Sequence, residues 1–249
     1  MVEDHPAIRE SVCEAMASCA EVELLPPCDD LPSGRELLAR QCPDLLLVDL
    51  GLPAGPGVTL IRMARVHWGE RCTSAVFSVT GTESKLMGAV EAGAKGVVFK
   101  SDPPSVWLDN ARLLASGQST LHPSMAGAML QRLLTRETAS AAQLELLQLF
   151  AAGYTMTEVA ERTERAEEEV GVLVRRIFDC FQQPVPDLSP RELELLSLLN
   201  RGYPFKKCSE LMGVSESTTK TQASRAYEKL GATNLQSALY EARQFGFIA

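Results

Sequence analysis

The sequence lacks the features that define several common classes of protein. It has no uninterrupted apolar stretch of the roughly 18 to 20 residues that cross a membrane, and the acids Glu3 and Asp4 stand where a secretory leader would be basic and then apolar. The seven cysteines are scattered, with no C-x-x-C pair and no histidine at ligand spacing, which argues against structural zinc and favours reduced thiols. We therefore expect a cytoplasmic protein that makes no contact with a membrane.

Positive charge is scarce as well. The chain carries 24 Lys and Arg against 32 Asp and Glu, a formal net charge of -8 at pH 7. An acidic surface repels polyanions, so the composition excludes indiscriminate binding to nucleic acid over the whole protein. Any contact with nucleic acid must be local.

What is present in the first 118 residues is an alternation of short apolar runs with helical patterns. The runs DLLLVDL (44–50), SAVFSVT (74–80) and GVVFK (96–100) are typical of buried strands. Helical spacing occurs at 8–17, 34–41 and 85–94. Strands that alternate with helices predict an α/β domain with a doubly wound, flavodoxin-like parallel sheet covered on both faces.

The second half of the chain contains an internal repeat and no predicted strand from Pro123 onward. Residues 140–181 align without gaps, at an offset of 49, with residues 189–230, and the copies share L-E-L-L and G-Y. The repeat predicts two all-α helical modules after the α/β domain. We assign residues 1–118 to the α/β domain, 119–139 to a linker, 140–183 to the first helical module and 187–249 to the second.

Polar side chains stand at the ends of the predicted strands. Asp49, Thr80 and Lys100 each end an apolar run, and Glu3 and Asp4 stand where a first strand would end. Because the carboxyl ends of parallel strands meet at one edge of a sheet, we expect these residues to lie together. Clustered carboxylates suggest a divalent cation, and Mg²⁺ fits oxygen ligands best. The backbone carbonyl of Gly51 offers a further oxygen ligand.

This constellation predicts phosphoryl chemistry. A carboxylate can act as a nucleophile toward phosphorus, and in that scheme the metal and the Lys100 ammonium offset the charge of the phosphoryl oxygens while the Thr80 hydroxyl donates a hydrogen bond. Each residue taken alone also has an ordinary structural explanation: a loop cap, a helix N-terminal charge pair, a strand-end threonine or a solvated lysine. Their joint occurrence at the predicted strand ends favours the phosphoryl site.

The motifs E-D-H-P, D-L-x-L-P, S-V-T-G, E-A-G-A-K-G and F-K, in this order, resemble the receiver domain of bacterial two-component response regulators. The resemblance implies that Asp49 is the phosphoacceptor and that Glu3, Asp4, Asp49 and the Gly51 carbonyl hold Mg²⁺. It also implies that Thr80 is the switch hydroxyl, that Lys100 contacts the phosphate, and that a sensor histidine kinase is the phosphoryl donor.

Two features depart from the family pattern. Only Met1 and Val2 precede the acidic pair, whereas a first strand needs about five residues. Val97 stands where the family usually has an aromatic residue, and Phe99 is the nearest ring that can substitute for it.

The second helical module, at 188–234, resembles the LuxR-type helix-turn-helix, and the pairing with a receiver resembles the NarL/FixJ subfamily. Ser189 and Glu192 form a capping-box signature, and Gly213 and Ser215 mark the turn and the next helix start. In that helix Thr219, Ala223, Ala226 and Leu230 should face inward. The outward Lys220, Thr221 and Ser224 suit contacts with bases in a major groove. The predicted contacts to the DNA backbone are Lys206, Lys207, Arg225 and Lys229.

A solvated helix face is the alternative explanation of this charge pattern. The amphipathic end of the chain, 235–248, dimerises in the family, so the resemblance implies a homodimer when the protein is active. Packing of this segment against its own module agrees equally well with the pattern.

The first copy of the repeat keeps the inner face and loses the outer one. Val170, Val174, Ile177 and Phe181 occupy the inward positions, whereas Gly171, Val172 and Leu173 replace the lysine, threonine and glutamine of the second copy. Three glutamates at 167–169 would be repelled by phosphates, so we predict a degenerate helix-turn-helix that does not bind DNA. An exposed Val172 and Leu173 would instead mark a protein contact.

The whole pattern predicts a transcription regulator that binds double-stranded promoter DNA under the control of phosphorylation. The main alternative is a phosphorylation-independent protein in which a pseudo-receiver and a helix-turn-helix serve as interaction or DNA-binding surfaces. An enzyme, such as a phosphatase that uses Asp49, is a weaker alternative, because the sequence has no second acid at D-x-D spacing.

Overall fold

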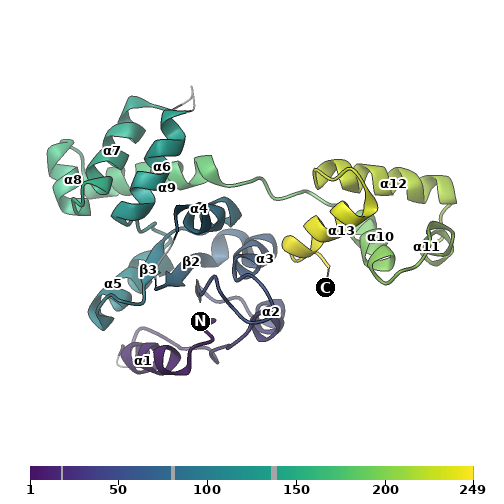
Figure 1. The fold of residues 1–249 in the computed structure, drawn as a ribbon, viewed down its shortest axis with the longest axis horizontal. Coiled ribbons are helices and arrows are strands. Elements are labelled where there is room, and N and C mark those ends of the chain that lie inside the picture. Colours follow the sequence, from purple (N-terminus) through teal and green to yellow (C-terminus); the bar gives the residue numbers. More distant parts are fainter. Residues whose placement is uncertain (18, 80–81, 136–138, 249) are drawn as a thin grey trace. The chain divides into compact units, whose positions relative to one another are not determined.

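The structure is a computed structural model of the 249-residue chain, and it describes residues 1–17, 19–79, 82–135 and 139–248. The chain divides into two compact units, Met1–Gln183 and Pro184–Ala249. We describe each unit by itself (Figure 1). In the described part of the chain, no helix is both long enough and apolar enough to span a bilayer.

A parallel sheet forms the centre of the first unit. Strands β1 (Leu45–Val48), β2 (Thr73–Ser78) and β3 (Val97–Phe99) lie in the order β1-β2-β3. Val2 forms parallel bridges to both Cys28 and Val48, so short pieces of chain extend the sheet beyond β1. The resulting order, from Cys28 through Val2 to β3, is the 2-1-3-4-5 order of flavodoxin-like sheets. The prediction of a doubly wound parallel sheet is confirmed.

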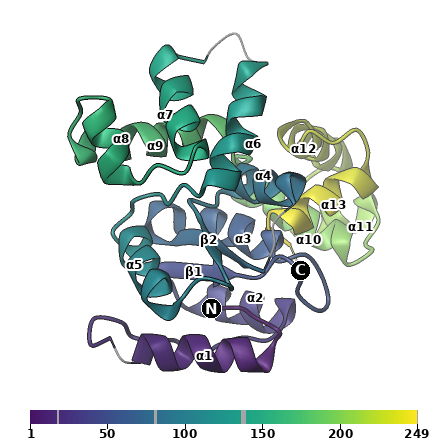
Figure 2. The same cartoon turned by 60° about the vertical axis from the view of Figure 1, so that its left-hand side comes forward.

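The sheet is covered on both faces because successive side chains of each strand point in opposite directions. Leu47, Phe77 and Val98 pack on one face against α1 (Pro6–Ala17) and α5 (Pro104–Ala115). Leu46, Val48 and Val76 pack on the other face against α2 (Leu31–Arg40), α3 (Val58–Trp68) and α4 (Glu83–Ala92). A 3₁₀ turn, Gly69–Arg71, joins α3 to β2. Figure 2 shows α1 and α4 on opposite sides of the strands.

Four further helices complete the first unit. They are α6 (Pro123–Leu134), α7 (Ala141–Ala151), α8 (Met156–Arg162) and α9 (Glu167–Phe181). In both views they form one group beside α4 (Figures 1 and 2). Their buried side chains, among them Met129, Leu146 and Phe178, continue the core that lies under α2, α3 and α4. The segment assigned to a linker therefore contains a packed helix, α6.

The second unit consists of α10 (Pro190–Asn200), α11 (Phe205–Met212), α12 (Glu216–Lys229) and α13 (Leu235–Gln244). Shifted back by 49 positions, the bounds of α10, α11 and α12 coincide with those of α7, α8 and α9 to within one residue at either end. The internal repeat thus predicted the helices of both copies. Whether the first copy is a degenerate helix-turn-helix stays a prediction, as do the bounds of the four segments assigned from the sequence.

The capping chemistry explains where the helices of the repeat begin. Ser140 and Ser189 both form capping boxes, with Gln143 and Glu192 respectively. Gly213 ends α11 with a φ of 67°, in the left-handed region that favours glycine, and Ser215 caps α12. The turn between α11 and α12 is therefore the one that the sequence predicted.

Candidate functional site

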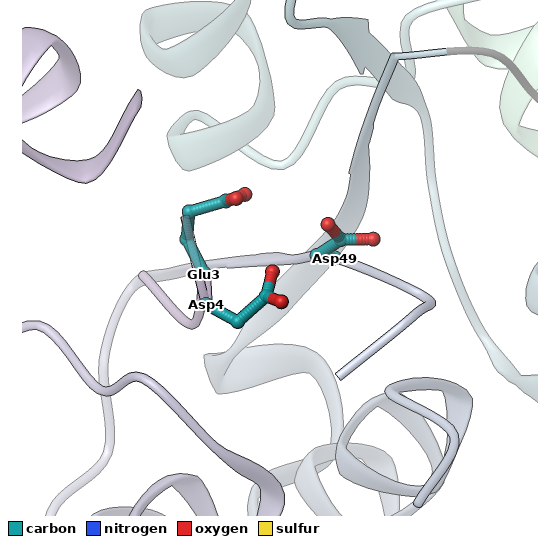
Figure 3. Close-up of side chains that lie close together, drawn as sticks. All are labelled: Glu3, Asp4 and Asp49. Atoms are coloured by element: carbon teal, nitrogen blue, oxygen red, sulfur yellow. The ribbon is translucent and has the colours of Figure 1, made fainter. Parts of the chain in front are cut away.

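Three carboxylates from two distant segments meet at the carboxyl end of β1. The backbone N–H of Asp49 donates to the carbonyl oxygen of Val2 (3.0 Å), and the N–H of Val2 donates to the carbonyl oxygen of Leu47 (2.9 Å). This pairing places Glu3 and Asp4 beside Asp49, although only two residues precede them. One oxygen of each carboxylate lies within 4.8 Å of the others (Figure 3).

Lys100 supplies the positive charge of this cluster. It directly follows β3, and its ammonium donates to Oδ2 of Asp49 and to Oε1 of Glu3 (2.9 Å), with Oε2 of Glu3 at 2.7 Å. The side chain of Lys100 is 6% exposed and that of Glu3 is fully buried. Burial alone would lower the pKa of Lys100, but its hydrogen bonds to Asp49 and Glu3 outweigh that effect and raise the pKa. Lys100 is therefore charged at neutral pH.

The loop after β1 holds Asp49 in place. The backbone N–H of Gly51 donates to Oδ1 of Asp49 (2.9 Å). A Cβ added to Gly57 would lie 1.8 Å from the carbonyl oxygen of Asp49, so only glycine lets α3 begin this close to the acid. The sequence pattern pointed to Gly51 but not to Gly57, because the close approach at Gly57 depends on how the loop folds back.

The donor set fits Mg²⁺. Glu3, Asp4 and Asp49 offer only oxygen atoms, which are the ligands that this hard cation takes in proteins. Together with the Lys100 ammonium, the three carboxylates carry a formal charge of -2, which one divalent cation would neutralise. The Gly51 amide is directed at Asp49; that the Gly51 carbonyl acts as a ligand stays a prediction.

The remaining predicted receiver residues are only partly described. Thr80 lies outside the described residues. Val97 is buried, at 3% exposure, and brings no ring to the site. Phe99 instead contacts the ring of His122, with ring centroids 4.3 Å apart. Sequence reasoning missed His122, because a single histidine beyond the last strand carries no signal of its own.

In the second unit, burial divides α12 as predicted. Thr219, Ala223, Ala226 and Leu230 are all buried. Lys220, Thr221, Ser224 and Arg225 are exposed. Lys220 pairs with Glu216 (2.7 Å) in an exposed salt bridge, while the hydroxyls of Thr221 and Ser224 donate to carbonyl oxygens one turn earlier in the helix.

The predicted backbone-contacting lysines differ in their surroundings. Lys206 and Lys207 are exposed on α11, and Lys207 pairs with Glu210 (3.1 Å). Lys229 instead lies 2.8 Å from Oε2 of Glu192, a carboxylate that is 5% exposed and also accepts the N–H of Ser189. Lys229 therefore has a structural partner that the sequence pattern did not reveal.

The first copy of the repeat presents a different face. Val170, Val174, Ile177 and Phe181 are buried, as predicted. Val172 is 51% exposed. The expectation that Leu173 is exposed is wrong: it is partly buried and packs against the core of the first unit.

Comparison with known proteins agrees with this architecture. Residues 1–109 match the response regulator receiver domain, and residues 186–242 match the luxR family of bacterial regulatory proteins. The chain therefore combines a receiver domain with a LuxR-type DNA-binding domain, which is the domain pairing of response regulators of the NarL/FixJ type. It is a phosphorylation-controlled regulator of transcription.

Individual relatives cover nearly the full chain. The transcriptional regulatory protein DegU of Brevibacillus brevis is 22% identical over 100% of this chain and 93% of its own. The nitrate/nitrite response regulator protein NarL of Escherichia coli K12 is 25% identical over 92% of this chain and 87% of its own. A solved structure of the RcsB response regulator of Salmonella typhimurium covers 96% of this chain and 94% of its own, at 19% identity and a TM-score of 0.45.

Proposed function

We propose that Asp49 accepts a phosphoryl group from a sensor histidine kinase, and that this modification controls the binding of promoter DNA by residues 187–249. The observation that carries the proposal is the meeting of residues 3, 4, 49 and 100 at one edge of the sheet. Four charged residues from three distant segments form a single cluster with an excess of negative charge. In a receiver domain, such a cluster is suited to phosphoryl transfer rather than to stability alone.

The chemistry follows from the charges in the cluster. A carboxylate oxygen of Asp49 forms a bond to phosphorus as the bond from phosphorus to the donor imidazole nitrogen breaks, and that nitrogen keeps the electron pair. Lys100 then exchanges its hydrogen bond to the Asp49 carboxylate for one to a phosphoryl oxygen, because the phosphoryl oxygens now carry the negative charge that attracts the ammonium. Thr80, which follows β2 in the sequence, is the residue that the family resemblance implies as the hydroxyl donor to another phosphoryl oxygen.

Glu3, Asp4 and Asp49, with the Gly51 carbonyl, would hold Mg²⁺. The bound cation offsets the charge of the phosphoryl oxygens. The side chain of Glu3 is fully buried and is fixed by Lys100, so it serves to position the site. Asp4 is exposed and has greater freedom to adjust to a cation.

For the DNA contact we assign α12 as the recognition helix. Lys220, Thr221 and Ser224 lie on its exposed face, where they suit contacts with base edges, and Arg225, Lys206 and Lys207 suit phosphates. The Lys220–Glu216 pair is exposed, and such pairs contribute only about 0.2 to 1 kcal/mol, so DNA can displace Glu216 at small cost. Lys229 is a weaker candidate for a phosphate contact, because Glu192 already holds it.

We further propose that the protein is cytoplasmic and that the active form is a homodimer on DNA. A dimer places two recognition helices on neighbouring half-sites, which matches the usual geometry of helix-turn-helix regulators. Tyr240, on α13, is 58% exposed, a large ring on the segment that the family resemblance implies in dimerisation.

A binding experiment tests the proposal. Double-stranded DNA selected by the full chain from a random pool is titrated with the protein, with and without acetyl phosphate and Mg²⁺. We expect acetyl phosphate to tighten binding by the wild type and not by Asp49→Asn. Asp44→Asn is the matched control, because Asp44 is an exposed acid at the opposite end of β1. Equal effects of acetyl phosphate on the wild type and on Asp49→Asn would contradict the control of DNA binding through Asp49.

The same DNA tests the recognition helix. Lys220→Ala should weaken binding by about 1 to 3 kcal/mol if the lysine contacts a base, and the loss should depend on sequence. Arg191→Ala, on α10, is a matched control, because it removes an exposed positive charge of the same module that likewise pairs with a glutamate, Glu194. If Lys220→Ala binds as tightly as the wild type, α12 does not read DNA through this residue.

A further inference from the structure

The first copy of the repeat, α7 to α9, which we call the middle repeat, turns toward α5 of the receiver, across a hollow, the face that its homologous copy exposes on α12. Alignment at the offset of 49 matches Lys220, Thr221 and Ser224 of α12 with Gly171, Val172 and Arg175 of α9. These three residues of α9 line a hollow of about 750 Å³, and Val106 and Leu113 of α5 line its other side. The guanidinium of Arg175 donates to the carbonyl oxygen of Gly117, just beyond α5.

A second group of polar contacts joins the middle repeat to the receiver further along α9. The ammonium of Lys95, just before β3, lies 2.6 Å from the carboxylate of Asp179. The backbone N–H of Gln183 donates to the carbonyl oxygen of Glu91 at the end of α4 (2.9 Å), and Arg65 donates to the carbonyl oxygen of Gln183 (2.6 Å). These contacts fix the far end of α9 on the receiver.

The receiver elements next to these contacts, β3 and α4, are connected to the phosphoryl site through β3 and α6. Lys100 at the end of β3 contacts Asp49, and the preceding residue, Phe99, packs on His122. His122 caps α6, because its Nδ1 accepts the N–H of Ser124 (3.2 Å). Arg132 of α6 in turn pairs with Glu91 of α4. One ring contact therefore connects the Asp49–Lys100 pair to the helix that begins the α6–α9 group.

We propose that the middle repeat is an intramolecular partner of the receiver, and that Lys100, Phe99 and His122 transmit the phosphorylation of Asp49 to it. This inference rests on the proposed phosphorylation of Asp49. When Lys100 moves from the Asp49 carboxylate to a phosphoryl oxygen, β3 shifts with it, and the ring of Phe99 no longer supports His122 and α6 in the same position. The contacts of α9 with the receiver then weaken. His122 is a positioning residue in this scheme and does not touch the phosphoryl group.

Hydrogen exchange of the full-length chain tests the inference. Exchange of the α6 and α9 amides is measured with and without acetyl phosphate and Mg²⁺, and the mass of the intact protein shows whether a phosphoryl group has been added. In the wild type we expect these amides to exchange on the order of tenfold faster after phosphorylation, as for the loss of about one stabilising contact. His122→Asn keeps a capping side chain and removes the ring. This variant should still gain the phosphoryl mass but lose the change in exchange.

The outcomes separate the two proposals. A wild type that gains the phosphoryl mass with unchanged exchange in α6 and α9 overturns the inference and leaves the proposed function intact. A wild type that gains no mass refutes both. His67→Asn is the matched control, because His67 lies on α3 and its Nδ1 lies 3.0 Å from the carbonyl oxygen of Met63 in the same helix. This variant should behave as the wild type.

A charge exchange tests the docking contact independently. Asp179→Lys should speed exchange in α9 without any phosphoryl donor, because it places two positive charges together. Combining it with Lys95→Asp should restore slow exchange. If the double variant exchanges as fast as Asp179→Lys, this ion pair does not hold the middle repeat on the receiver.

Discussion

Replacement of Lys100 by methionine tests whether the acidic cluster depends on its cation. Methionine keeps much of the length of the side chain and removes the ammonium. The change leaves Glu3, which is fully buried, and Asp49, which is 16% exposed, without a positive partner. Removal of one member of a buried ion pair costs about 3 to 5 kcal/mol, because the remaining charge is left uncompensated. We expect the free energy of unfolding of Met1–Gln183 to fall by an amount in this range.

The assay is urea unfolding followed by tryptophan fluorescence. Both tryptophans, Trp68 and Trp107, lie in the first unit, so the signal reports this unit alone. Unfolding in EDTA should show the full loss, and Mg²⁺ should restore part of it. A cation that binds only the folded state stabilises it by about 2.7 kcal/mol at one hundred times its dissociation constant.

The control is Arg40→Ala, which removes one partner of an exposed pair. The side chains of Arg40 and Glu36 are 75% and 64% exposed, so this pair should contribute only about 0.2 to 1 kcal/mol. If Lys100→Met loses no more than Arg40→Ala, or if Mg²⁺ has no effect on it, the description of the cluster as a charge-compensated cation site is wrong.

Three other expectations follow from single contacts. Gly57→Ala should lower the free energy of unfolding by roughly 1 to 3 kcal/mol in urea, because the new Cβ would collide with the carbonyl oxygen of Asp49. Gly88→Ala is the control: Gly88 faces open space on α4, so this change should be neutral or stabilising. Burial lowers the pKa of His122 below the ordinary 6.5, and the negative charge of Asp102 opposes this shift. The folded state therefore binds the His122 proton less readily than the unfolded state, and the free energy of unfolding should fall as the pH drops through 6.5. In urea unfolding at a series of pH values, His122→Asn should show a weaker pH dependence in this range. Lys229→Ala leaves Glu192 without its lysine partner and should lower the free energy of unfolding of Pro184–Ala249 by roughly 1 kcal/mol, measured by calorimetry. An unchanged unfolding transition would exclude the structural role of Lys229.

The fold was largely predictable from local patterns. The apolar runs at 44–50, 74–80 and 96–100 became β1, β2 and β3, because short runs rich in Val, Leu and Phe are stable only when buried on both faces. The gapless repeat fixed the helices of both copies, because caps and turns are encoded within a few residues of each helix end. The packing of the middle repeat on the receiver was not predictable, since it depends on contacts such as Lys95 with Asp179, 84 positions apart in the chain.

The candidate site was predictable in composition but not in detail. Parallel topology brings strand ends together, so the meeting of Asp49 with Glu3, Asp4 and Lys100 followed from the order of the strands. The sequence contained no sign that Lys100 contacts Glu3 as well as Asp49. The same is true of Lys229, whose pairing with Glu192 depends on how α12 crosses α10. An outward charge pattern on one helix cannot distinguish a side chain that contacts DNA from one that pairs with a neighbouring helix.

The central claim is that Asp49 receives phosphorus with the help of a cation held by its acidic neighbours. The most direct measurement is the intact mass of the full-length protein after incubation with acetyl phosphate, followed by location of the added group by peptide mapping. We predict one phosphoryl group on Asp49 of the wild type and of Asp44→Asn in Mg²⁺, and none in EDTA or in Asp49→Asn. Phosphoryl addition to Asp49→Asn, or addition to the wild type that persists unchanged in EDTA, would contradict the account.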